Sequence, residues 1–235
     1  MDYFYQPDIL SDAFHLNEEE SRHCAKVLRK KVEDQIIVLD GKGGVYTCRI
    51  KKVHHKQVEF EIIDKRTMEK SGYSVHLVIA PTKNADRIEW LIEKSIEIGL
   101  HQISFIECHN SERHRLNMAR IRKKVISAMK QCQDPFLPVV NDLIPLKDYL
   151  DTADENSEKY ICHASSGNGN YLLNAAKRDA SYQVLIGPEG DFTKEELSQT
   201  RKKGFIPVSL GDSRLRTETA GLVACVILNA LNLKT

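Results

Sequence analysis

The sequence has almost no net charge, because its 235 residues include 34 lysines and arginines and 33 aspartates and glutamates. A protein that binds nucleic acid through its overall field carries a clear basic excess, so any such surface must here come from local clusters. No apolar run approaches the roughly 20 residues that cross a bilayer. The first ten residues also lack the basic-then-apolar plan of a signal peptide. We therefore expect a cytoplasmic protein without a membrane anchor.

Cysteines with metal-ligand spacing are absent as well. Six cysteines stand far apart, at positions 24, 48, 108, 132, 162 and 225. None forms a C-x-x-C pair, which argues against a zinc site and a disulfide framework alike. Cys108-His109 and Cys162-His163 resemble ligand pairs, but neighbours in a strand point to opposite faces of a sheet. We expect packing in the core at these positions and no bound metal.

No glycine-rich motif of a nucleotide-binding loop is present. The run Gly41-Lys42-Gly43-Gly44 lies between two β-rich segments and does not open a helix, so it predicts a hairpin turn. No G-x-G-x-x-G follows a strand, which argues against a nicotinamide-dependent oxidoreductase.

The pattern of elements changes near residue 70. Residues 1–70 predict one helix, over 17–31, and several short strands, which is typical of a small β-barrel. The predicted strands of this part cover 35–40, 45–53 and 57–63. The segment 65–74 is charged and contains Gly72, so it is a plausible linker.

Residues 73–235 alternate strands and helices, which predicts a parallel sheet covered by helices on both faces. The predicted strands are 75–80, 103–108, 159–164, 182–187 and 205–210. The predicted helices are 84–98, 117–133, 171–178, one from Thr193 and one from about Thr219. The last helix is apolar nearly all round, so it is either a core helix or part of a dimer interface.

Two loops carry the residue types of a binding site, and each leaves a strand and enters a helix. The first is Ile186-Gly187-Pro188-Glu189-Gly190-Asp191-Phe192, followed by a predicted capping box of Thr193 and Glu196. The second runs from Leu210 to Gly221, and Thr217 or Thr219 is expected to cap its helix. Ligands bind at the carboxyl ends of strands in open α/β sheets. Each loop also has a plain structural reading, as a tight turn or a salt-bridged helix start.

LIGPEGDF, followed by SLGDSRLRTETAGL, resembles the signature of the RsmE family of the SPOUT superfamily, whose members methylate N3 of a uridine in 16S ribosomal RNA. VIAPTKNADRIEWLIEKSIEIGLHQI and Ser111-Glu112-Arg113 are similar to further family segments. FHLNEEESRHCAKVLRKKVEDQIIVLDGKGGVYTCRI is similar to the family's N-terminal RNA-binding domain. The resemblance thus covers nearly the whole chain. It departs from the family at Asp191, where glycine is frequent, and at Lys130–Asp134, where Glu-Gln-Ser-Gly-Arg is frequent.

The resemblance implies an α/β fold of two domains, a PUA-like β-barrel over 1–70 and a SPOUT domain over 73–235 with a deep trefoil knot. It implies a homodimer with the site at the subunit seam, which favours the interface reading of the last helix. It implies S-adenosylmethionine as the methyl donor, bound at the two loops. The expected cofactor-binding residues are Ile186, Gly187, Pro188, Glu189, Gly190, Leu210, Gly211, Leu215, Arg216, Thr217 and Ala220.

Catalysis is expected at Arg216 and Glu218. Arg216 would stabilise negative charge on a uracil oxygen, and Glu218 would accept a proton or orient Arg216. RNA contacts are expected from basic residues, four of them placed on one face of the first helix. These predicted RNA-binding residues are Arg22, Lys26, Arg29, Lys30, Lys83 and Arg113.

The expected partner is the small ribosomal subunit with its 16S RNA. Two alternatives stay open. One is a SPOUT methyltransferase acting on another RNA, and the other is a non-catalytic RNA-binding protein of ribosome assembly.

Overall fold

The computed structural model describes residues 2–11, 13–163 and 170–233. The chain forms two compact units, one made of residues 1–70 with 126–137 and the other of residues 71–125 with 138–235. Each unit is described by itself below.

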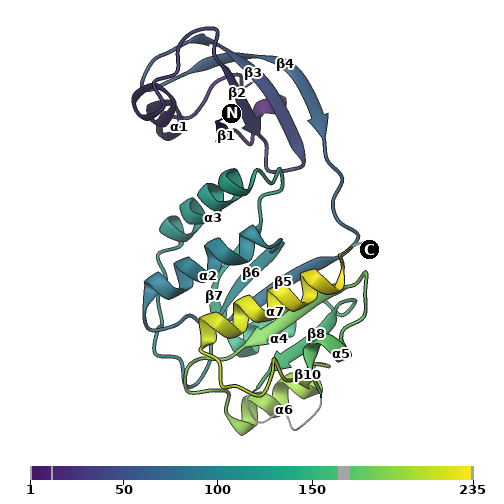
Figure 1. The fold of residues 1–235 in the computed structure, drawn as a ribbon. Helices are drawn as coiled ribbons and strands as arrows, with labels where there is room; N and C mark the ends of the chain where they lie inside the picture. Colours follow the sequence, from purple (N-terminus) through teal and green to yellow (C-terminus); the bar gives the residue numbers. More distant parts are fainter. Residues whose placement is uncertain (1, 12, 164–169, 234–235) are drawn as a thin grey trace. The chain divides into compact units, whose positions relative to one another are not determined.

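The N-terminal unit contains a four-stranded sheet in the order β1-β2-β3-β4 (Figure 1). Its strands are β1 (Tyr3–Tyr5), β2 (Gln35–Leu39), β3 (Gly44–Lys52) and β4 (Glu59–Thr67). β1 pairs parallel with β2, and the other pairs are antiparallel. The three strands predicted here are confirmed, whereas the three-residue β1 was not predicted. The predicted hairpin turn is confirmed, because Asp40 Oδ1 accepts hydrogen bonds from the backbone amides of Lys42 and Gly44.

The first helix is shorter than predicted. A short 3₁₀ turn (Ile9–Ser11) precedes α1 (Glu18–Arg22), which continues as one π-helical segment, η2 (His23–Val27). Arg29 has a φ of 54°, in the left-handed region, and this ends the helix. Lys30 lies beyond that end and pairs with Asp2 at 2.7 Å. The prediction that Arg22, Lys26, Arg29 and Lys30 share one helical face is therefore wrong.

Residues 126–137 complete the N-terminal unit from far along the chain. They include the last turns of α3 (Met118–Cys132). Met129 is fully buried against Ile37 and Leu39 of β2, and Lys130 forms an ion pair with Glu20 of α1. Helical periodicity predicts the buried face of α3 but not the partner that covers it.

The C-terminal unit is built on six parallel strands in the order β10-β8-β9-β5-β6-β7. The strands are β5 (Ser74–Ile79), β6 (Gln102–Glu107), β7 (Val139–Pro145), β8 (Glu158–Cys162), β9 (Ser181–Ile186) and β10 (Ile206–Val208). The predicted parallel sheet is confirmed. β7 was not predicted, because its centre is Asn141-Asp142 and an edge strand needs no continuous apolar run.

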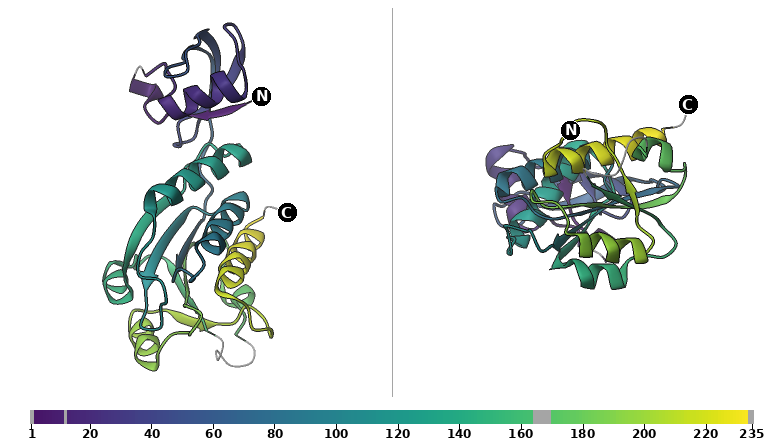
Figure 2. Two further views of the ribbon diagram at one scale, coloured as in Figure 1. Left: turned by 90° about the vertical axis from the view of Figure 1, so that its left-hand side faces the viewer. Right: turned by 90° about the horizontal axis from the view of Figure 1, so that it is seen from below.

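Helices cover both faces of this sheet (Figure 2). α2 (Ala85–Glu97), α5 (Leu172–Ala175) and α7 (Thr217–Leu231) lie on one face. α4 (Leu146–Thr152), which was not predicted, and α6 (Lys194–Lys202) lie on the other. Gly221 lets α7 pack closely, because a Cβ there would lie 3.2 Å from both Ile79 and Leu91. The chain after β5 enters α2 and the chain after the neighbouring β9 enters α6, so the two loops lead to opposite faces of the sheet.

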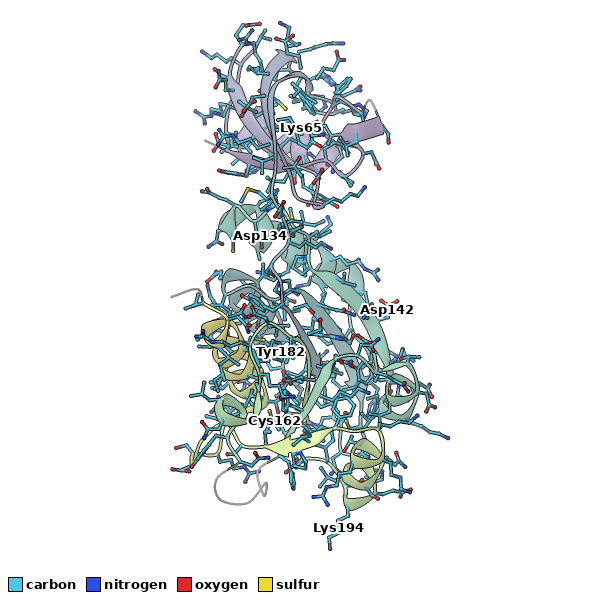
Figure 3. The ribbon with its side chains drawn as sticks, turned by 90° about the vertical axis from the view of Figure 1, so that its right-hand side faces the viewer. Lys65, Asp134, Asp142, Cys162, Tyr182 and Lys194 are labelled. Atoms are coloured by element: carbon cyan, nitrogen blue, oxygen red, sulfur yellow. The ribbon has the colours of Figure 1, made fainter. Side chains whose placement is uncertain are left out.

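The buried cysteines behave as packing residues. Cys108 lies in the core between the sheet and helices α4 and α6, and burial raises the pKa of its thiol. Burial likewise raises the pKa of the Cys162 thiol at the end of β8 (Figure 3). Within residues 2–11, 13–163 and 170–233, no three His, Cys, Asp or Glu side chains gather as a metal site would need. In the same ranges no helix is long and apolar enough to span a membrane.

A half-buried histidine on the α4 face is expected to make stability depend on pH. His76 Nε2 lies 2.7 Å from Ser104 Oγ, and burial lowers the pKa of His76 to about 4. The unfolded chain protonates this ring below about pH 6.5, so the unfolded state binds more protons between pH 6.5 and 4. Stability present above pH 6.5 is therefore lost as the pH falls towards 4.

We expect this loss to reach roughly 3 kcal/mol, at about 1.4 kcal/mol per pH unit of pKa difference. Urea unfolding of the wild type and of His76→Gln between pH 7 and pH 4 measures it. The variant should show a shallower loss of stability over this range. Parallel pH profiles for the two proteins would contradict the assignment.

Candidate functional site

The loop after β9 is fixed by two neighbouring loops. Glu189 Oε1 accepts a hydrogen bond from the backbone amide of Lys83, in the loop after β5, at 3.1 Å. Asn110, in the loop after β6, donates from Nδ2 to the carbonyls of Gly190 at 3.1 Å and Asp191 at 3.0 Å. A Cβ on Gly190 would lie 2.9 Å from the Cβ of Asn110. This position therefore needs glycine for the loop to come so close.

Asp191 holds a backbone conformation that favours glycine. Its φ is 61°, which costs an ordinary residue about 1–3 kcal/mol. The side chain offsets this cost, because Oδ1 accepts from the amide of Phe192 at 2.8 Å and Oδ2 lies 2.8 Å from Nδ1 of His163. Asp191 thereby ties the loop after β9 to the loop after β8.

Replacing Asp191 by valine is expected to lower the free energy of unfolding by roughly 2 kcal/mol, because a β-branched residue tolerates positive φ poorly. Asp191→Gly is the matched control, since it relieves the backbone cost while losing the same two side-chain contacts. Thermal unfolding of both variants separates the cost of the backbone conformation at positive φ from the loss of the two side-chain contacts. Equal destabilisation by valine and glycine would show that the backbone conformation contributes little.

The loop after β10 is joined to the same assembly through the loop after β8. Tyr171 donates its hydroxyl to Asp212 Oδ1 at 2.7 Å, and the amide of Ser209 donates to the carbonyl of Asn170 at 2.9 Å. Because β8, β9 and β10 run parallel, the two loops predicted from sequence leave the sheet at the same edge. They do so although β8 separates β9 from β10 in the strand order.

A pocket of about 790 Å³ lies where α2 and α7 begin. The residues that line it are Asp86, Arg87, Trp90, Arg214, Leu215, Arg216, Glu218 and Thr219. Arg216 and Glu218, predicted as catalytic, are thus brought to one site. Asp86, Arg87 and Trp90 were not predicted as site residues. They lie in the segment VIAPTKNADRIEWLIEKSIEIGLHQI, whose resemblance to a family segment gave them no assigned role, and Trp90 is 45% exposed.

Glu218 is held in this pocket at a cost. It is 7% exposed, and its Oε1 lies 3.6 Å from Nε of Arg87. Its Oε2 is buried without a hydrogen-bond partner in the described part of the chain. A buried carboxylate oxygen without a hydrogen-bond partner destabilises the fold.

Arg216 lies beside Glu218 but has a different environment. It is the N-cap residue of α7 and is exposed, and within the described ranges its guanidinium forms no ion pair. Its side chain makes no capping hydrogen bond. The expected cap by Thr217 or Thr219 is wrong, because α7 already begins at Thr217 and both residues lie in its first turn. The helix start is left open to an acceptor from outside.

The predicted cofactor-binding residues differ in what they expose. Ile186, Pro188 and Thr217 are buried, so their side chains serve packing. Leu210 and Leu215 are half-buried and offer apolar surface. The backbone lies near the surface at four of these residues, Gly187, Glu189, Gly190 and Gly211. Ala220 is half-buried in α7.

The predicted RNA-binding residues of this unit serve the loops. Arg113 Nε donates to the carbonyl of Thr82 at 2.9 Å, and its guanidinium also reaches the carbonyl of Lys83. Lys83 Nζ pairs with Glu112 at 2.9 Å. Both side chains thus help to fix the loops after β5 and β6 beside Glu189.

Comparison with known proteins places the chain in a family. The family model described as an RNA methyltransferase domain matches residues 69–229, and the RNA methyltransferase PUA domain matches residues 16–63. The chain is 29% identical to the ribosomal RNA small subunit methyltransferase E of Buchnera aphidicola, over 97% of this chain and 92% of that one.

Two solved structures share the whole fold. The first is a probable rRNA-methyltransferase from Porphyromonas gingivalis, with 34% identity, a TM-score of 0.90, and 99% and 98% of the two chains covered. The second is a ribosomal RNA small subunit methyltransferase E from Neisseria gonorrhoeae bound to S-adenosyl methionine. It has 29% identity, a TM-score of 0.86 and the same coverage. The chain therefore belongs to the RNA methyltransferase family of ribosomal RNA small subunit methyltransferase E, with a PUA domain preceding its α/β domain.

Proposed function

We propose that this protein transfers a methyl group from S-adenosylmethionine to N3 of a uridine in the 16S RNA of the small ribosomal subunit. Family membership supports the methyltransferase class, and the Neisseria gonorrhoeae relative is bound to that donor. The observation that carries the proposal is a pocket lined by both Arg216 and Glu218, in which Oε2 of Glu218 is buried without a hydrogen-bond partner among the described residues.

The residues present suit the proposed cofactor. Gly187 and Gly190 keep the loop after β9 narrow, because Phe192 and Asn110 pack directly against them. Leu210 and Leu215 supply apolar surface for an adenine ring. We assign binding of S-adenosylmethionine to both loops. The other residues that we expect to contribute, through backbone groups or by packing, are Ile186, Pro188, Glu189, Gly211, Thr217 and Ala220. When bound, S-adenosylmethionine supplies a methyl group activated by the positive charge on its sulfur. The buried negative charge of Glu218 is compatible with a cationic ligand.

The protein must then handle one proton and one developing charge. Uracil N3 carries a proton in its neutral form, so methylation at N3 requires that proton to leave. The carboxylate of Glu218, which lines the pocket, accepts it. Arg216 stabilises the negative charge that develops on a neighbouring uracil oxygen. The exposed ring of Trp90 offers a surface on which the unstacked base can lie.

Small subunits from a strain that lacks this gene test the proposal. They are incubated with the purified protein and methyl-labelled S-adenosylmethionine, and the RNA is digested and its labelled nucleoside identified by mass. We expect labelled N3-methyluridine. Label at another position would contradict methylation at N3 of a uridine. Label only on another RNA, such as transfer RNA, would contradict 16S RNA as the substrate. Absence of both label and cofactor binding would make the protein a non-catalytic RNA-binding factor.

We further propose that the chain is a homodimer joined through the face of α2 and α7, and that its C-terminal part is knotted. Trp90 on α2 and Val226 on α7 are each 45% exposed, which places apolar surface on both helices beside the pocket. A dimer seam there would close the site. Sedimentation analysis is expected to give twice the chain mass of 26.8 kDa, and a monomer at micromolar concentration would contradict the dimer.

A further inference from the structure

One face of the parallel sheet changes from polar to apolar along its strands. Side chains two residues apart lie on the same face of a strand, and the adjacent strands β9, β5 and β6 begin with polar residues on the α4 face. These polar residues are Ser74, His76, Gln102, Ser104, Ser181 and Gln183. The next residues on this face, Val78, Ile106 and Leu185, lie in the core with α4. Strands of a covered parallel sheet normally read as continuous apolar runs, so core packing does not account for the polar half.

A second cavity, of about 330 Å³, lies over this polar half of the sheet. All six polar residues line it, together with Asn141 of β7, Tyr149 of α4 and Asp154 of the following loop. Its volume lies at the small end of the range of about 300–1,000 Å³ that is typical of small-molecule sites. The described residues that line it are different from those that line the pocket of Arg216 and Glu218.

A hydrogen-bonded group of three side chains fixes the middle of this cavity. Ser104 Oγ accepts a hydrogen bond from Asn141 Nδ2 at 2.8 Å and lies 2.7 Å from Nε2 of His76. Burial lowers the pKa of His76 to about 4, so the ring is neutral at pH 7 and the hydroxyl of Ser104 donates to Nε2. A neutral imidazole carries one proton, which is therefore on Nδ1 of His76.

The side chain of Gln183 fixes a second part of the wall. Its Oε1 accepts from the hydroxyl of Tyr149, and its Nε2 donates to the carbonyl of Asp154 at 3.0 Å. Gln183 is 2% exposed and Tyr149 is 5% exposed. The ring of Tyr149 therefore offers no surface on which an aromatic ligand can stack.

Four side chains at adjacent positions keep hydrogen-bonding capacity that the protein does not use. Within the described part of the chain, Nδ1 of His76, the amide of Gln102 and the hydroxyls of Ser74 and Ser181 form no hydrogen bond. His76 is the register partner of Gln102, and Ser74 is that of Ser181. Neighbouring strands lie about 4.8 Å apart, and residues on one face of a strand about 7 Å apart. The four groups can therefore contact one small molecule.

We infer that this cavity binds a small uncharged polyhydroxy molecule, a monosaccharide or a linear polyol. Serine hydroxyls and the glutamine amide both donate and accept hydrogen bonds, as the hydroxyl groups of such a ligand do. The inference does not depend on the proposed function, because the cavity and the pocket of Arg216 and Glu218 have separate linings.

The charges around the cavity support an uncharged ligand. Lysine and arginine are absent from its described lining, which disfavours an anion such as a phosphate. Asp142, labelled in Figure 3, is already paired with Arg122 at 2.8 Å. One oxygen of Asp154 accepts from the amide of Asn156 at 3.0 Å, and its carboxylate can accept further bonds from ligand hydroxyls.

Titration of the full-length protein with D-ribose, followed by NMR of the ring nitrogens of His76, tests the inference. The signals of this ring are identified by their loss in His76→Gln. We expect saturable shifts of the Nδ1 signal, and the same response to sorbitol. A shift that grows linearly without saturation would contradict binding, since polyols also act on proteins as general cosolvents.

The variant Gln102→Leu/Ser181→Ala removes two of the free groups. It is expected to bind D-ribose roughly 25-fold more weakly, at about fivefold for each lost neutral hydrogen bond. Thr152→Val is the matched control, because Thr152 lines the same cavity but donates its hydroxyl to the carbonyl of Tyr149 at 3.0 Å. The control should keep the wild-type affinity, and all these variants should transfer methyl groups at the wild-type rate.

The exposed position of Ser181 provides a second variant that does not disturb the fold. Ser181→Ala alone should weaken binding about fivefold, even if the double variant is unstable. Wild-type affinity in both variants would overturn the inference, and so would an equal loss in Thr152→Val. Tighter binding of ribose 5-phosphate than of D-ribose would show that the cavity selects an anion and would contradict an uncharged ligand.

Discussion

Replacing Arg216 by alanine is expected to lower the rate of methyl transfer at least about a hundredfold, the typical cost of removing one group that stabilises developing charge. The fold should not change, because the side chain is exposed, makes no capping hydrogen bond and forms no ion pair within the described ranges. Single-turnover transfer to small subunits measures the effect directly. Unfolding by urea confirms that stability is kept.

Arg214→Ala is the matched control, since Arg214 lines the same pocket, is also exposed and carries the same charge. We expect it to lower transfer much less than Arg216→Ala. Similar losses in the two variants would show that the pocket needs positive charge in general and not a guanidinium at one position. Near-normal transfer by Arg216→Ala would remove this residue from the mechanism.

Replacing Glu218 by glutamine is expected to change activity and stability in opposite directions. Transfer should fall about a hundredfold or more, because an amide cannot accept the N3 proton. The free energy of unfolding should rise by about 1 kcal/mol, because the fold no longer buries a charged oxygen without a partner. The ion pair that is lost with Arg87 contributes little, since its atoms are 3.6 Å apart and Arg87 is half-exposed.

Two measurements on the same protein test this prediction, single-turnover transfer and urea unfolding. A more stable but inactive variant would identify Glu218 as a residue kept for function at the expense of stability. Arg87→Gln helps to separate the roles. It keeps the carboxylate but removes its neighbour, so we expect a smaller loss of transfer than in Glu218→Gln. Reduced stability together with normal transfer in Glu218→Gln would make the residue structural.

The two site variants also distinguish binding from chemistry. Calorimetry with S-adenosylmethionine should give nearly wild-type affinity for Arg216→Ala, because the proposed role of that side chain concerns the base. If affinity falls as much as transfer, Arg216 belongs to the cofactor-binding residues. The comparison of affinity with transfer rate thus decides whether Arg216 acts on the base, on the cofactor or on both.

The sequence by itself determined the elements whose residues signal their own conformation. Periodicity predicted the buried strands and the amphipathic α2 and α3, because side chains repeat every second residue in a strand and every 3.6 in a helix. Thr193 and Glu196 predicted a capping box that is present in full. The motifs in the loops after β9 and β10 indicated the family, which the comparisons confirm.

Other features were decided only by tertiary structure, because they depend on residues distant in sequence. The polar β7 is a strand because β6 pairs with it. The end of α3 belongs to the N-terminal unit because β2 covers Met129. Arg87 and Trp90 join the pocket because α2 packs on α7. The turn between β3 and β4 lies against α1 because the amide of Val58 donates a hydrogen bond to Ser21 Oγ. Local signals carry no information about such partners, since a contact between distant segments is fixed by the packing of the whole unit.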